Sequence, residues 1–142
     1  MNANTLQYRA AAVQSATPVQ LLCMLYDTLV RDFNRILAAI KAGNIEARST
    51  EVKHALLVLE QLEAQLDKKN GGEAAANLAR LYAVARAKVL EGHARVEAPL
   101  FQELIALFQD VRTAWEQVME PRPPSDSEAP GKDRVASLSC SV

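Results

Sequence analysis

The chain has 142 residues, a net charge of −1 and two cysteines, which is the size of one domain with one hydrophobic core. Its near-neutral charge gives no electrostatic footprint for a nucleic acid or a membrane surface. Its N-terminus does not look like a signal peptide, and no apolar run reaches the roughly 20 residues of a membrane-spanning helix, so we expect a cytoplasmic protein with neither nucleic-acid nor membrane partners.

The N-terminal arm, residues 1–16, is polar apart from Leu6, Tyr8 and Val13. Tyr8 is a large side chain in an otherwise plain segment. We therefore expect the arm to dock on the rest of the protein as a short cap segment.

A first long helix is predicted from Thr17 to Ala42. Thr17 and Gln20 form a capping box, and Pro18 occupies the first helical position, where its missing N–H costs nothing. Gly43 suits the left-handed conformation that follows a helix end. Apolar residues recur at helical spacing and others flank them, so the apolar arc is wider than one core contact requires. The stripe consists of Leu22, Leu25, Tyr26, Leu29, Phe33, Ile36, Leu37 and Ile40.

Three further helices are predicted by the same periodicity, over residues 45–67, 73–91 and about 97–120. Asn44 is the expected N-cap of the second helix. Gly92 and His93 mark the expected break before the fourth. The third helix carries many alanines outside its apolar stripe, which indicates either a smooth surface for another helix or simple helix propensity. The tail, residues 121–142, is rich in proline, serine and charge, which is typical of disorder.

Four helices with short connections predict an all-α fold, an antiparallel up-down four-helix bundle spanning residues 17–120. The pattern L-x-x-L-Y occurs at residues 22–26 and again at 78–82. These copies fall in the first and third helices, which run parallel and lie diagonally opposite in such a bundle.

Catalytic and metal chemistry find little support in the sequence. A di-iron bundle needs two E-x-x-H motifs, and only Glu51-x-x-His54 is present, so we expect no metal and no cofactor. The alternative function is a helical-bundle signalling protein, acting either by phosphotransfer at His54 or as an adaptor, although no glycine follows His54 within the helix. His93 lies at the predicted break. No set of nucleophile, base and orienting group is visible, so we do not expect an enzyme.

Several motifs resemble the FliS-type flagellar export chaperones, which serve flagellin. They are Tyr8-Arg9, the run from Val13 to Pro18 and Leu21-Leu22-x-Met24-Leu25-Tyr26-Asp27. Gly43-Asn44-Ile45-Glu46, Leu66-Asp67, Gly71-Gly72-Glu73, Asn77-Leu78, Leu81-Tyr82 and Ala114-Trp115 follow in the same order. The resemblance covers about residues 6–119. This chain departs from the family in the third helix, where residues 84–88 lack a second aromatic and paired arginines, and in its tail.

The resemblance implies a chaperone of flagellar type III export that binds the disordered C-terminal segment of flagellin, prevents premature polymerisation and contacts other export components. Such a segment can lay apolar anchors into grooves between helices. The residues expected to bind the partner are Leu6, Tyr8, Val13, Leu21, Met24, Tyr26, Ala79 and Leu81. We further hypothesise that the arm covers a groove until flagellin binds. The spare apolar surface also allows self-association.

Overall fold

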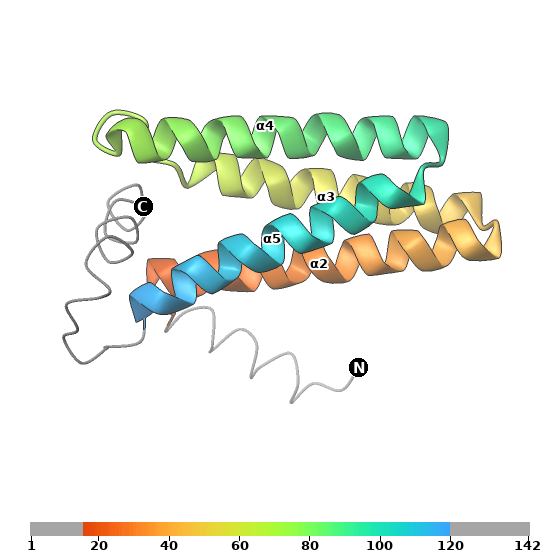
Figure 1. Ribbon diagram of the computed structural model, residues 1–142, viewed down its shortest axis with the longest axis horizontal. Coiled ribbons are helices and arrows are strands. Elements are labelled where there is room, and N and C mark those ends of the chain that lie inside the picture. Colours follow the sequence, from red (N-terminus) through yellow and green to blue (C-terminus); the bar gives the residue numbers. More distant parts are fainter. Residues whose placement is uncertain (1–15, 120–142) are drawn as a thin grey trace.

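The computed structural model describes residues 16–119, which form four helices and no strand. They are α2 (Pro18–Ala42), α3 (Ile45–Ala64), α4 (Gly72–Arg95) and α5 (Ala98–Met119) (Figure 1). The all-α prediction is thereby confirmed. The predicted cap segment and the predicted disordered tail lie outside the described residues. No helix of residues 16–119 is long and apolar enough to cross a membrane.

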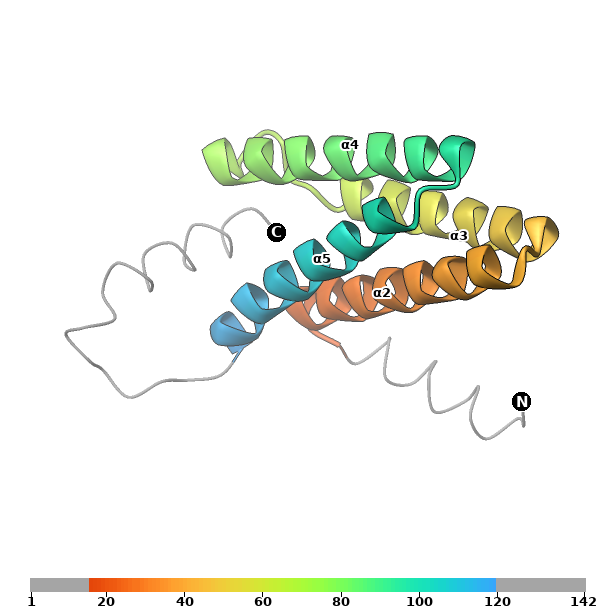
Figure 2. The same cartoon turned by 45° about the vertical axis from the view of Figure 1, so that its right-hand side comes forward.

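Successive helices run in opposite directions, as predicted for an up-down bundle (Figures 1 and 2). Helix α2 packs against α3 and α5, and α4 completes the ring by packing against the same two helices. Helices α2 and α4 are therefore diagonal partners. Helix α5 runs obliquely across α2, which Figure 2 shows clearly.

The capping signals at the first turn act as the sequence predicts. Thr17 accepts a hydrogen bond from the backbone N–H of Gln20, whose side chain accepts one from the backbone of Thr17. Gly43 ends α2 in the left-handed conformation, with φ 66°. Asn44 then donates its N–H to the carbonyl of Ala39 and accepts from the N–H of Ala47, so one residue closes α2 and opens α3.

Two helix ends differ from the prediction. Helix α3 stops at Ala64 rather than Asp67, and α4 continues through Gly92 to Arg95. The expected break at Gly92 is wrong because this glycine provides space rather than a turn. A Cβ atom there would lie 2.8 Å from the Phe101 ring. The reversal occurs instead at Val96, which adopts φ 56°, a left-handed conformation that is costly for a β-branched residue.

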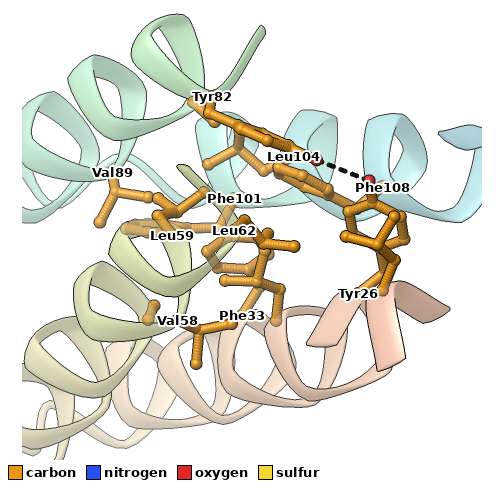
Figure 3. Packing of buried hydrophobic residues seen from close by; sticks show 14 of the residues in the cluster. Tyr26, Phe33, Val58, Leu59, Leu62, Tyr82, Val89, Phe101, Leu104 and Phe108 are labelled. Atoms are coloured by element: carbon orange, nitrogen blue, oxygen red, sulfur yellow. Dashed lines mark hydrogen bonds between the residues drawn. The ribbon is translucent and has the colours of Figure 1, made fainter. Parts of the chain in front are cut away.

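The centre of the core joins the two diagonal helices. The hydroxyls of Tyr26 and Tyr82 lie 2.6 Å apart, and both side chains are fully buried (Figure 3). Phe108 stacks on Tyr82 with ring centroids 6.5 Å apart. Burial is the main cause that raises the pKa of Tyr26 to about 12, and it also raises the pKa of Tyr82. The hydrogen bond with Tyr82 partly opposes the rise of the pKa of Tyr26. The indole Nε1 of Trp115 has no hydrogen-bond partner within residues 16–119.

Candidate partner-binding surface

The structure places the expected partner-binding residues in different environments. Met24 is exposed, with 36% of its surface accessible, whereas Leu21, Ala79 and Leu81 are half-buried. Tyr26 is fully buried, so contact between its ring and a partner would require opening of the core. The remaining three lie outside the described residues: Leu6, Tyr8 and Val13.

The described members of this set do not form one surface. Leu21, Met24 and Tyr26 belong to α2, whereas Ala79 and Leu81 belong to α4, its diagonal partner. The contact between these groups passes through the core, from Tyr26 to Tyr82. The repeated L-x-x-L-Y pattern therefore marks the diagonal contact that the sequence predicted. Its tyrosines serve packing at the centre rather than a surface.

Helix α4 presents a different candidate, which we call the α4 outer face. Its buried residues include Leu78, Tyr82, Ala85 and Val89. The opposite side of the helix carries exposed small and apolar side chains with Arg80 among them, and the charged side chains of Glu73 and Glu91 are exposed beside them. This face consists of Ala76, Arg80, Ala83, Val84, Ala87, Leu90 and Ala94. It extends along some 27 Å of the helix at 1.5 Å per residue.

The outward faces of the neighbouring helices are more polar, which distinguishes the α4 outer face. In α3, exposed Leu57 lies among lysine, glutamate and glutamine residues. In α5, Ala106 is exposed among glutamine, glutamate and aspartate residues. Within residues 16–119, α4 is the helix with the largest share of small and apolar residues among its exposed positions. The alanine content of the third predicted helix already indicated an exposed apolar side. The sequence alone did not settle this, because high helix propensity explains the same composition.

Ion pairs cross the boundaries between neighbouring helices. Most of these side chains are partly exposed, so each pair adds little stability. They place charge at the helix boundaries, while the α4 outer face itself carries Arg80, with Glu91 exposed beside it. The pairs are Arg35–Glu51, Arg86–Glu63, Lys88–Glu103 and Arg112–Asp27.

A second cluster joins α2 to α3. Asp32, which is 1% exposed, places Oδ2 2.5 Å from Nδ1 of His54, and Glu51 lies beside them. The prediction drew attention to Glu51 and His54 but missed Asp32. The missed signal is a carboxylate at the edge of the apolar stripe of α2.

Comparison with known proteins agrees with the resemblance seen in the sequence. The model of the family described as "Flagellar protein FliS" matches residues 1–122. The flagellar secretion chaperone FliS of Salmonella typhimurium is 31% identical over 76% of this chain and 81% of that protein. The flagellar secretion chaperone FliSB of Pseudomonas aeruginosa is 27% identical over 76% and 86%. The Escherichia coli FliS is 26% identical over 75% and 79%.

These matches span most of the chain and most of each relative. Helices α2 to α5, which run from Pro18 to Met119, all lie within the matched region. The relatives carry the name of flagellar secretion chaperones. The chain belongs to the FliS family of flagellar secretion chaperones.

Proposed function

We propose that this protein is a cytoplasmic chaperone that binds the C-terminal segment of flagellin through the α4 outer face. The family and the names of its relatives support a role in flagellar secretion. The observation that carries the choice of surface is the exposed apolar side of α4, where Val84 and Leu90 are 52% and 50% exposed. Exposed apolar surface of this kind is typical of sites for partner proteins.

The small side chains of this face suit a helical partner. Alanine at positions 76, 83, 87 and 94 lets the backbone of a second helix approach closely, while Leu90 and Val84 offer larger contacts. A disordered amphipathic segment can place apolar anchors at i, i+3, i+4 and i+7 along such a surface. Folding on binding costs about 2–5 kcal/mol of the gross interaction, which keeps the complex reversible.

The test places a charge in the middle of the face. Ala87→Glu should weaken binding of a flagellin C-terminal peptide by at least tenfold, because a carboxylate would be desolvated against the apolar side of the peptide. The matched control is Ala106→Glu, the same change on the exposed side of α5. Isothermal titration calorimetry measures both. Circular dichroism verifies that each variant keeps its helices.

Two results would contradict parts of this proposal separately. If the unmodified protein fails to bind the peptide, flagellin is not the partner. If Ala87→Glu and Ala106→Glu bind as well as the unmodified protein, the partner occupies another surface.

The N-terminal arm gives a second experiment on the same binding event. We propose that residues 1–12 cover part of a groove between helices when flagellin is absent and move when it binds. Deleting them should raise the affinity or the association rate for the flagellin peptide, as measured by stopped-flow fluorescence. Unchanged kinetics would show that the arm does not compete with the partner.

A further inference from the structure

The cluster at the boundary of α2 and α3 combines three metal-ligating groups. Glu51 and His54 are one helical turn apart on α3, and Asp32 faces them from α2. Each offers one ligand atom, and the three atoms lie within 4.8 Å of one another. A single E-x-x-H motif did not suffice for a metal site in the sequence, but the fold supplies a third ligand.

The environment of Asp32 distinguishes this cluster from ordinary surface carboxylates. Asp32 is almost fully buried, and its Oδ1 has no hydrogen-bond partner within residues 16–119. An orphaned buried carboxylate oxygen is costly unless a cation or a donor satisfies it. Burial raises the pKa of Asp32, the interaction with His54 opposes that rise, and Glu51 reinforces it. A buried acid beside a second acid is a position that a cation would stabilise.

We propose that Asp32, Glu51 and His54 bind one divalent transition-metal ion of the zinc class, joining α2 to α3. One imidazole nitrogen with two carboxylate oxygens is a donor set that suits zinc better than magnesium or calcium, which prefer oxygen alone. Two carboxylates and a neutral imidazole also balance the charge of the ion. Three protein ligands leave a fourth position for water.

The geometry requires a small rearrangement. Ligand atoms about 2.1 Å from a tetrahedral ion lie roughly 3.4 Å from each other. The 2.5 Å contact between Asp32 Oδ2 and His54 Nδ1 must therefore open by about 1 Å, with the ion replacing the shared proton. The side chain of His54 is 51% exposed, so its rotation is unhindered from the solvent side and an ion has a path of entry.

Two arginines near the cluster would compete with a bound ion for its carboxylates. Arg35 Nη1 lies 3.8 Å from Glu51 Oε1. The positive charge of Arg31 lowers the pKa of Asp32 slightly without contacting it. The side chain of Arg35 is 58% exposed, so its contact with Glu51 is screened by solvent and can be displaced. Neither arginine contacts the unpartnered Oδ1 of Asp32 within hydrogen-bond distance.

The test uses the full chain without an affinity tag, treated with chelator and then titrated with zinc at neutral pH. We expect one zinc ion per chain by calorimetry and a higher melting temperature with zinc. His54→Ala and Glu51→Gln should each weaken binding at least tenfold and abolish the thermal shift. His93→Ala is the matched control, since it removes the second of the two histidines, whose ring contacts Arg48 outside the cluster.

A background variant, Cys140→Ser, removes a thiol that could bind zinc by itself, while Cys23 is buried. Retained binding in this background and in His93→Ala supports the site. Three outcomes overturn it: no binding by the unmodified protein, binding that survives both cluster substitutions, or loss of binding in His93→Ala. In each of those cases, Asp32 and His54 form only a hydrogen-bonded pair.

Discussion

The hydroxyl groups of Tyr26 and Tyr82 lie 2.6 Å apart and join helices α2 and α4 across the diagonal of the bundle. Each is the polar tip of a fully buried ring, and each satisfies the other. We expect Tyr26→Phe and Tyr82→Phe each to lower the free energy of unfolding by about 1–3 kcal/mol, because either change leaves one hydroxyl buried without a partner. Urea denaturation measures this loss.

The double variant Tyr26→Phe/Tyr82→Phe sharpens that prediction. It removes both hydroxyls and leaves neither unpaired, so it should cost less than the sum of the single changes. Strict additivity would show that the two hydroxyls do not depend on each other.

The same pair predicts a loss of stability at high pH. The pKa of Tyr26 rises from 10.0 to about 12 on folding, mainly because the ring is buried. Below pH 10 both states carry a neutral phenol and the full stability is present. As pH rises from 10 towards 12 the unfolded state ionises first, so about 3 kcal/mol of stability is lost. Urea denaturation between pH 9 and 12 measures it. Tyr26→Phe/Tyr82→Phe should lose this part of the pH dependence.

Gly92 should resist replacement by alanine despite lying within a helix. Alanine improves helix propensity by about 1 kcal/mol, but its Cβ would lie 2.8 Å from the buried ring of Phe101. That ring packs against Phe33, with centroids 6.2 Å apart, and has little room to move. We expect Gly92→Ala to destabilise the protein by about 1–2 kcal/mol. Thermal denaturation measures the loss, and Phe101→Leu in the same chain should reduce it. If Gly92→Ala instead raised the stability, the ring of Phe101 would have moved aside without strain.

Replacing Val96 by glycine should stabilise the protein. It ends α4 at φ 56° and ψ 51°, a conformation that costs a β-branched residue roughly 1–2 kcal/mol. Glycine is favoured at this position, and Val96 is 45% exposed, so little apolar burial is lost. Val96→Gly should raise the free energy of unfolding by about 1 kcal/mol in urea. An equal or lower stability would indicate that the side chain of Val96 makes a contact worth more than the strain.

The capping residues show which parts of the fold are readable in the sequence. Thr17, Gln20 and Asn44 act through neighbours three residues away, so local sequence suffices to predict them. Gly92 was misread because a glycine that ends a helix and a glycine that admits an aromatic ring look alike in sequence. Phe101, which explains it, lies on another helix.

The candidate surfaces were less predictable for the same reason. The α4 outer face is recognised as exposed only once Leu78, Tyr82 and Val89 are seen to fill the core. Asp32 was missed because its partners, Glu51 and His54, are brought to it by the packing of α3 on α2. Periodicity predicts which residues share a face of a helix. Which helix packs against that face becomes known only from the assembled bundle.

The turn at Asn44 bears on where new chain ends can be introduced. This residue closes α2 and starts α3 at once, so an insertion there would break the ends of both helices together. The connection over residues 65–71 has no such shared residue, and α2 begins at the end of the bundle where α5 finishes (Figure 1). A circular permutant opened between Lys68 and Lys69, with its original ends linked, would therefore keep every helix cap described here. Such a protein would present α4 at the start of the chain and α3 at its end.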